Sequence, residues 1–412
     1  MKEKIKNIFS PRSIIIWAFI LIVIATIPEF TEPAMSQTEA IVNMLCIDKV
    51  EEQYEIATSV LTPTQDKTSN YQVYSGTGNT VGEAVENVSL AIGKEMGFAQ
   101  CEIMAFGNNL SEDGILSSLD YLTRTRKVGR NAILINFTGK GKDFAQAVSD
   151  LSKEKTLKLE NIMNFDKRYI LSRDSNIDSF YKGYFSEISL GIMPQVKLEE
   201  IEKDNAIEVQ ASGSGSSSSN SGSSSGESEQ QKKYLLNDGT MSVFKQGKKV
   251  LEIEPSMVQK INLFLNLSQE GTLKVENVTD EIYNNATIIF DLSNKSISLK
   301  PEFKNNKPIY NIEIDLTVLV EEVIEEKPNN DFLRRNKEFL TPTAVKKLKT
   351  TIKNEMETVI NYCKEHQIDL LNVYRQFNRK KYKDFQAYYN QEKENYLDNI
   401  EYNIEVKVKS AY

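Results

Sequence analysis

The stretch TVGEAVENVSLAIGKEM, Thr80 to Met96, decides how the first half of the chain folds. Thr80 and Glu83 have the spacing of a capping box, in which the threonine oxygen accepts a hydrogen bond from a free backbone N–H and the glutamate reaches back toward the cap. Apolar residues behind this cap recur three or four positions apart: Val81, Ala84, Val88 and Ala91. The spacing predicts a helix from Val81 to about Met96.

Short apolar runs on both sides of this helix predict strands. Strands are expected at 41–47, 54–61, 101–106 and 132–137, and further helices from Ser111 onward and around 144–151. The polar segment 48–53 is predicted to be the turn between the first two strands. Because strands and helices alternate, this half is predicted to be α/β or α+β.

A tract of serine and glycine divides the chain. Fourteen of the fifteen residues from Ser212 to Gly226 are Ser or Gly, a composition that is typical of a flexible linker. We predict four regions: a basic leader and anchor at 1–35, an N-terminal α/β part at 36–205, the linker at 206–233 and a C-terminal α+β domain at 234–412. The tract is compatible with two loosely joined domains and with a long loop between elements that dock.

The second half carries the pattern of a sheet with one long helix. Strands are predicted at 241–244 and 250–253 around a turn at Gly247, as a pair at 286–292 and 296–299, and at 311–320 and 400–408. Thr341 and Pro342 stand in the usual order of a helix cap and first helical residue. An apolar stripe follows them to Cys363. The fold class is therefore predicted as α+β, with antiparallel sheets packed with helices, behind one N-terminal transmembrane helix.

The membrane segment is predicted at Ser13–Ile27, fifteen uncharged residues that follow a basic leader. This length suits a signal peptide, but no A-x-A cleavage site follows the run, and the first cysteine is as late as Cys46. Of three interpretations, a cleaved signal, a buried helix and an uncleaved anchor, we favour the anchor, with the rest of the chain outside the membrane. The anchor residues are Ile14, Ile15, Ile16, Trp17, Phe19, Ile20, Leu21, Ile22, Val23 and Ile24.

Composition weakens several function classes. The net charge is −8 and no basic stripe dominates any segment, which argues against nucleic acid as a partner. Three scattered cysteines do not form a metal cluster or a disulfide framework, and the single histidine is His366. No nucleophile–base pair is evident, so no catalytic, metal-binding or cofactor-binding residue and no small-molecule substrate are predicted.

Three arginines are the candidate partner contacts: Arg124, Arg126 and Arg130. Their planar guanidinium groups suit paired hydrogen bonds to carboxylates of a partner protein. The alternative is a solvated helix end whose positive charge complements the helix dipole.

Particular strings resemble the Ger(x)C family, the C subunits of spore nutrient germinant receptors. They are CIDKVEEQYEIATSVLTP at 46–63, the block from Gly76 to Ile135, Gly191-Ile192-Met193-Pro194, and MSVFKQGKKVLEIEP at 241–255. Glu321-Glu322 and Asp369 also fall at family-like places. The resemblance covers roughly Gln37 to the C-terminus. It departs from the family in lacking a lipobox cysteine, in having Ala99-Gln100 where many relatives have Gly-His, and in lacking tryptophans in the C-terminal part.

The resemblance implies a three-domain mixed α/β ectodomain without known enzymatic activity, cofactor or metal, on the outer surface of the inner spore membrane. It implies assembly with an A-type subunit and a transporter-like B-type subunit. The main hypothesis is therefore a non-enzymatic, membrane-anchored subunit of a germinant receptor. The alternatives are an envelope solute-binding or cell-wall-associated protein that shares the fold, and an exported hydrolase, which would need a nucleophile–base pair.

Overall fold

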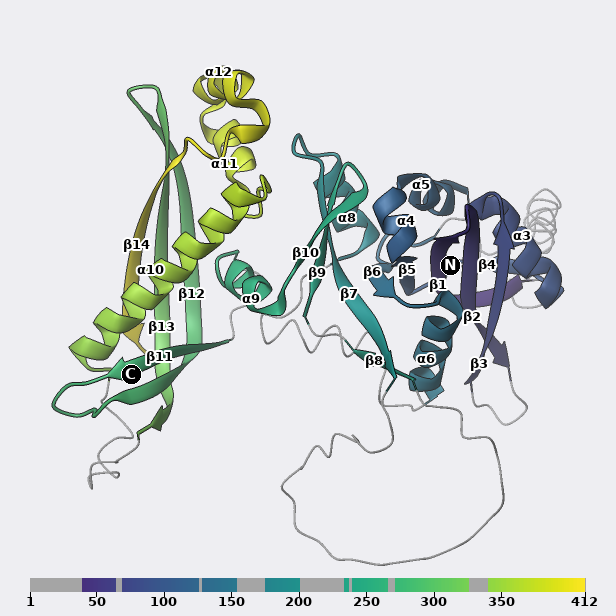
Figure 1. The fold of residues 1–412 in the computed structure, drawn as a ribbon, viewed down its shortest axis with the longest axis horizontal. Helices are drawn as coiled ribbons and strands as arrows, with labels where there is room; N and C mark the ends of the chain where they lie inside the picture. The colour runs from purple at the N-terminus through teal and green to yellow at the C-terminus, as the bar shows by residue number, and fades with distance from the viewer. Residues whose placement is uncertain are drawn as a thin grey trace, which may run out of the picture.

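A computed structural model describes residues 39–63, 69–125, 128–153, 175–200, 233–236, 239–265, 271–325 and 340–411, which form two sheets flanked by helices (Figure 1). The predicted anchor and the Ser/Gly tract lie outside these residues. Among the residues described, no helix is both long enough and apolar enough to cross a membrane.

The first sheet has the strand order β10-β9-β7-β6-β5-β1-β2-β3, with β4 beside β1 and β8 beside β7. Its strands are β1 (Glu39–Val50), β2 (Gln53–Pro63), β3 (Ser69–Gly78), β4 (Glu95–Gly97), β5 (Ile103–Gly107), β6 (Ile133–Thr138), β7 (Leu190–Glu200), β8 (Lys233–Leu236), β9 (Met241–Lys245) and β10 (Lys248–Ile253). Strands β1, β5, β6 and β7 are parallel neighbours. The mixed α/β prediction is confirmed, but the prediction of antiparallel sheets is wrong for the central strands of this sheet. Helices connect β5, β6 and β7 and return the chain to the same end of the sheet, so these strands run parallel.

Helices cover both faces of the first sheet. On one face α3 (Val81–Ile92), α5 (Leu116–Thr125) and α8 (Ile177–Tyr184) share a core with alternate strand residues such as Met104 and Phe106. On the other face α6 (Gly141–Lys153) packs on the intervening residues, among them Ile103 and Ala105. The period of two in the strands therefore distributes their side chains between two separate cores.

The helix predicted at 81–96 is present but ends earlier, at Ile92. The Thr80 hydroxyl accepts from the Glu83 N–H at 3.1 Å, and the Glu83 carboxylate accepts from the N–H of Asn79 at 2.8 Å, one residue before the expected cap. Gly93 ends the helix in the left-handed region, with φ 72°, which glycine adopts without steric cost.

Two other boundaries differ from the sequence prediction. The turn predicted at 48–53 shrinks to Glu51-Glu52, both with positive φ, because the flanking polar residues continue the ladder between β1 and β2. The helix predicted from Ser111 is two helices, α4 (Asn108–Asp113) and α5, separated at Gly114 with φ 130°.

The second sheet has the order β11-β12-β13-β14, with bounds Thr272–Val278, Ala286–Lys304, Lys307–Ile324 and Glu401–Ser410. The strand pair predicted at 286–299 is one long strand, β12, because its bulges interrupt the side-chain alternation without ending the ladder. The last strand, β14, pairs parallel to β13 and not antiparallel as predicted.

Four α-helices of the described residues pack with the second sheet, directly or through one another: α9 (Pro255–Leu263), α10 (Pro342–Glu365), α11 (Val373–Lys380) and α12 (Tyr382–Glu392). The long helix α10 begins as predicted, with the Thr341 hydroxyl accepting from the Ala344 N–H at 3.1 Å. Its buried stripe, which includes Leu348, Ile352 and Met356, covers one face of the sheet (Figure 1).

The hairpin β9–β10 confirms the turn predicted at Gly247, but its place in space was not expected. Strand β9 pairs antiparallel with β7, from Leu190 opposite Lys245 to Pro194 opposite Met241. A hairpin that follows the Ser/Gly tract in sequence therefore completes the sheet of the preceding part. The chain passes from the first sheet to the second only after β10, through α9.

A buried lysine holds α9 against the second sheet. Lys295 in β12 follows a bulge and is only 6% exposed. Its ammonium group donates to the carbonyl oxygen of Leu263 at 2.7 Å and of Asn262 at 3.4 Å, at the end of α9. Both carbonyls lie at the C-terminal end of α9, so the positive charge sits where it complements the helix dipole. Burial lowers the pKa of Lys295 to about 8.

This pKa predicts a dependence of stability on pH. The unfolded chain keeps the proton up to a pKa of about 10.4, so between that value and the folded pKa the unfolded state binds more protons. Stability then rises as pH rises through this range. Relative to Lys295→Met, the free energy of unfolding of the wild type is expected to rise by up to about 3 kcal/mol. Urea denaturation from pH 7 to 10.5 measures the difference in unfolding free energy between the wild type and Lys295→Met. The variant Lys346→Met, at an exposed lysine, is the control. A difference that stays constant with pH would contradict the assignment.

Candidate functional site

Two of the three predicted arginines lie on the surface of the first part. Arg124 is in the last turn of α5, where its guanidinium pairs with Asp120 at 2.8 Å, and its side chain is 76% exposed. Arg130 is exposed in the turn before β6, and its carbonyl accepts from the N–H of Asp178 at the start of α8. Arg126 lies outside the described residues. A role for these arginines in partner contact stays a prediction.

An aromatic group that the sequence reasoning missed lies beside them on α8. Phe185 is 76% exposed, and its ring centroid lies 5.6 Å from that of Tyr181 and 5.0 Å from that of Tyr184. The hydroxyls of Tyr181 and Thr123 are 3.2 Å apart, which ties α8 to α5. Burial raises the pKa of Tyr181, although the nearby charge of Arg130 opposes the shift. The string YKGYF, with three aromatic residues in five positions, was the signal in the sequence that could have found this group.

We call the residues at the end of α5, in the turn before β6 and at the end of α8 the arginine–aromatic surface: Thr123, Arg124, Arg130, Tyr181, Tyr184 and Phe185. Tyrosine and arginine are enriched at the energetic centres of protein interfaces, because they combine large contact area with directed hydrogen bonds. This residue composition is typical of surfaces that contact a macromolecule.

A second feature is a buried polar junction between the two sides of the Ser/Gly tract. Asn136 in β6 is fully buried; its amide donates to the Phe106 carbonyl at 2.9 Å and to the Ser111 hydroxyl at 2.8 Å. Its side-chain oxygen accepts from the hydroxyl of Ser242 in β9 at 3.0 Å. Three of the four hydrogen-bonding positions of this amide side chain are thus engaged, each with a different element.

The junction continues outward to the edge strand. Ser242 also lies 3.3 Å from the side-chain oxygen of Gln195, whose amide donates to Glu252 in β10 at 3.2 Å. Lys249, with a side chain only 6% exposed, pairs with the same carboxylate at 2.8 Å. Burial would raise the pKa of Glu252, but the hydrogen bonds and charge of Lys249 outweigh it and hold the pKa below its usual range. The junction fixes the hairpin on the first sheet, and its outer end at Glu252 is exposed.

A third feature is the buried carboxylate of Asp369, before α11. Its oxygens accept from the N–H groups of Val373 at 2.8 Å and Tyr374 at 2.7 Å, and from the hydroxyl of Tyr396 at 3.0 Å. Burial raises the pKa of this carboxyl, and the same hydrogen bonds oppose the shift. Asp369 therefore supplies the cap of α11 that the left-handed Asn372 does not provide.

A cavity of about 440 Å³ separates α8 and the start of β7 from the segment 369–375. Around it the two parts are joined by side chains, since the amide of Asn378 donates to Glu187 at 3.2 Å and the ammonium of Lys245 lies 3.4 Å from Glu394.

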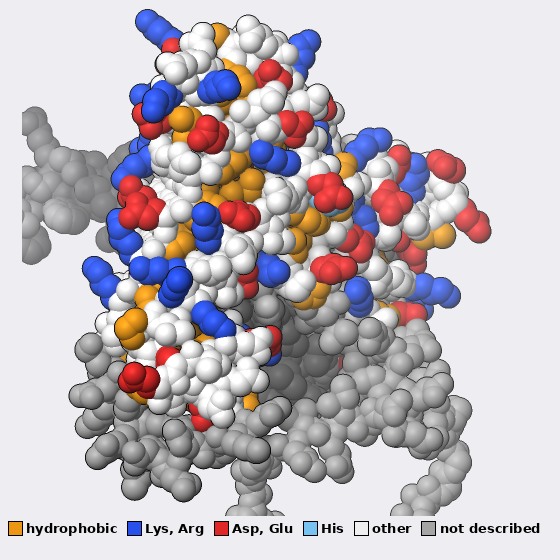
Figure 2. Space-filling model, turned by 60° about the vertical axis from the view of Figure 1, so that its left-hand side comes forward, with side chains coloured by type: hydrophobic (Ala, Val, Ile, Leu, Met, Phe, Trp, Pro, Cys, Tyr) orange, Lys and Arg blue, Asp and Glu red, His pale blue; other side chains and the backbone are white. Residues whose placement is uncertain are grey.

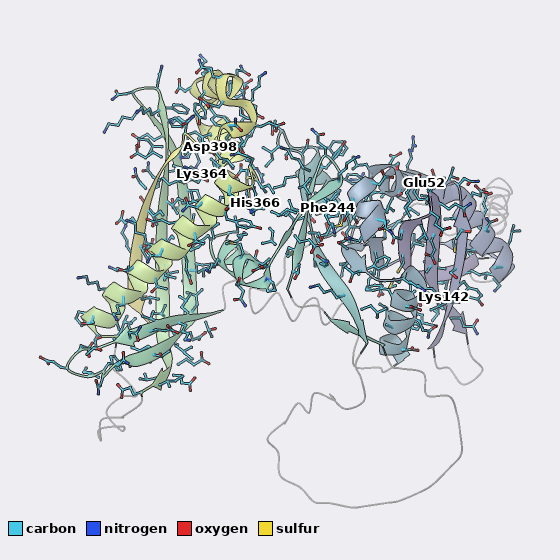
Figure 3. The ribbon with its side chains drawn as sticks, viewed as in Figure 1. Glu52, Lys142, Phe244, Lys364, His366 and Asp398 are labelled. Atoms are coloured by element: carbon cyan, nitrogen blue, oxygen red, sulfur yellow. The ribbon has the colours of Figure 1, made fainter. Side chains whose placement is uncertain are left out.

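Groups that often carry catalysis are placed in structural roles. Cys46, Cys101 and Cys363 are buried free thiols, and burial raises their pKa, to about 12 for Cys101 and Cys363. His366 follows α10, near Lys364 and Asp398 (Figure 3), and its ring lies 4.4 Å from that of Tyr362. Within the described ranges, no three His, Cys, Asp or Glu side chains are grouped so that they could hold a metal ion.

Comparisons with known proteins agree with the fold. Residues 36–198 match the family described as "Spore germination protein N-terminal domain", and residues 239–411 match "Spore germination B3/ GerAC like, C-terminal". A solved structure described as "Crystal Structure of the GerBC protein" is similar with a TM-score of 0.51 and 13% identity, over 89% of this chain and 97% of that chain. At this identity the likeness concerns the fold. No curated protein sequence matches the chain.

Proposed function

This chain belongs to the Ger(x)C, or GerAC-like, family of spore germination proteins, and we propose that it acts as a non-enzymatic subunit of a germinant receptor. Its role is assembly with the other receptor subunits, an A-type and a transporter-like B-type protein, at the spore membrane. The segment 13–27 anchors it there, with the folded part outside. The single observation that carries the assembly role is the exposed arginine–aromatic surface.

Several features of the described residues support binding over chemistry. The buried polar groups of the junction are hydrogen-bonded to one another and fix strands and helices. The apolar side chain of Phe185 is instead strongly exposed, against the ring of Tyr181, and Arg124 is exposed on the neighbouring helix α5. Charge and aromatic area together give both the attraction and the buried contact that a protein partner requires.

The double variant Arg130→Glu, Phe185→Ser tests this role. It reverses one charge and removes one exposed ring, so it is expected to leave folding unchanged and to reduce co-purification of the other receptor subunits from spore membranes at least tenfold. Leu90→Ser, Lys94→Glu is the matched control, because it makes the same two kinds of change at exposed positions: Leu90 in α3 is 78% exposed, and Lys94 follows the end of that helix. Equal co-purification by the two double variants would contradict the assignment of this surface.

A further inference from the structure

Strand β14 is the outermost strand of the second sheet. It pairs with β13 along its whole length, from Glu401 to Ser410, and no strand among the described residues pairs with its other edge (Figure 1). Such an edge presents a row of backbone N–H and C=O groups that another extended chain can bind. A groove of about 370 Å³ lies beside this edge, with Lys353 and Glu357 of α10 among its lining residues.

The side chains of β14 divide into two kinds. Those that face α10 are apolar and half-buried: Tyr402, Ile404, Val406 and Val408. Those on the opposite face are polar and exposed: Glu401, Asn403, Glu405, Lys407 and Lys409. Figure 2, which brings this side of the molecule forward, shows hydrophobic side chains gathered between basic and acidic ones. Any chain that pairs with this edge meets both sets at once.

The sequence of β14 is complementary to itself when two copies run antiparallel about an axis at Val406. Glu405 then lies opposite Lys407 twice, and Ile404 lies opposite Val408 twice. Opposite charges and apolar pairs placed directly across two strands stabilise their pairing. Moving the centre by one residue in either direction places Glu405 opposite Glu405 or Lys407 opposite Lys407. Both neighbouring registers also contain two Glu–Lys pairs, formed by Lys409 with Glu401 or with Glu405, but each adds one like-charge pair. Charge therefore favours the register centred on Val406 by the absence of that repulsion.

We propose that β14 is a homodimer interface, at which it pairs antiparallel with β14 of a second copy of this chain, centred on Val406. The pairing is isologous, so the same surface serves both copies and the assembly closes at two. In one copy, Lys407 and Glu405 are 3.2 Å apart, and this hydrogen bond and charge raise the pKa of Lys407. In the dimer each of these two side chains exchanges its partner within the strand for the oppositely charged side chain of the second copy.

Val406→Cys in the full-length chain tests the centre of symmetry. Directly opposed residues of antiparallel strands have Cβ atoms about 4.5–5.5 Å apart, which a small adjustment brings within disulfide range. Mild oxidation of intact membranes is expected to convert most of this variant to a covalent dimer. Val250→Cys is the control, because Val250 is 52% exposed on another edge strand, β10, and the native thiols are buried.

A charge exchange tests the register. With Val406→Cys present, Lys407→Glu and Glu405→Lys are each expected to reduce the covalent dimer at least tenfold, because each places like charges opposite one another. The double exchange is expected to restore it. The proposal is overturned if Val406→Cys forms no more dimer than Val250→Cys, if Lys407→Glu leaves the dimer unchanged, or if the new thiol links only to a different protein. Because the readout is self-association, it is independent of the proposed role in germination.

Discussion

Gly183→Ala is expected to destabilise the protein by about 3 kcal/mol, because it overfills a packed site in a way that no rotamer change relieves. Gly183 lies in α8, and a Cβ atom added there would sit 2.0 Å from the carbonyl oxygen of Leu190 in β7. The neighbour is backbone, so either α8 or β7 must move. The movement would disturb Tyr184 and Phe185, which follow directly and belong to the arginine–aromatic surface.

Gly129→Ala is the matched control for this variant. Apart from its two neighbours in the chain, no atom of the described residues lies within 4 Å of a Cβ added at Gly129, and its φ is not in the left-handed region. Its free energy of unfolding in urea is expected to equal that of the wild type or to exceed it slightly, because alanine restricts the unfolded chain. Equal stabilities for Gly183→Ala and Gly129→Ala would show that α8 and β7 are not packed as described.

Asn136→Leu is expected to cost about 3 kcal/mol and to loosen the hairpin β9–β10 selectively. Leucine has a similar volume but leaves the Phe106 carbonyl and the hydroxyls of Ser111 and Ser242 without the partner they now have. A buried polar group that loses its hydrogen bond costs about 1–3 kcal/mol. Because Ser242 lies in β9, the substitution weakens the contact between β6 and the hairpin, which lie on opposite sides of the Ser/Gly tract in the sequence.

Hydrogen exchange measures this effect strand by strand. Amides of β9 and β10 are expected to exchange faster in Asn136→Leu, while those of β1 and β2 change less, since that pair lies on the other side of β5. The exposed Asn354→Leu on α10 is the control and is expected to leave both sets unchanged. Uniform acceleration over the whole sheet would mean that the junction supports the fold generally and does not fix the hairpin in particular.

Local signals were sufficient for most individual elements. The cap at Thr80, the cap at Thr341 and the turn at Gly247 each depend on residues within four positions of one another, and each was predicted correctly. The predicted helix boundaries were wrong where a single glycine ended or interrupted a helix in spite of the apolar spacing. Gly93 ends α3 although apolar spacing continues, and Gly114 divides a predicted helix in two.

Long-range pairing was not accessible from the sequence. Nothing in the residues 241–253 distinguishes a hairpin that starts a new sheet from one that extends an earlier sheet, because the pairing depends on the edge that β7 presents. The direction of β14 depended likewise on how the chain returns after α12. The arginines could be named as candidates because charge at a helix end is a local signal. The aromatic residues of α8 are distant in the sequence, with 58 positions between Thr123 and Tyr181, and come near α5 only in the fold.

Nutrient-triggered germination is the most direct test of the proposed function. Spores that lack this gene, in a strain without a second copy, should fail to lose optical density after exposure to nutrients that trigger the parent strain. A copy of the wild-type gene should restore the response, as should the Leu90→Ser, Lys94→Glu variant, whereas Arg130→Glu, Phe185→Ser should not. Unchanged germination of the deletion strain across the nutrients to which the parent responds would contradict the account.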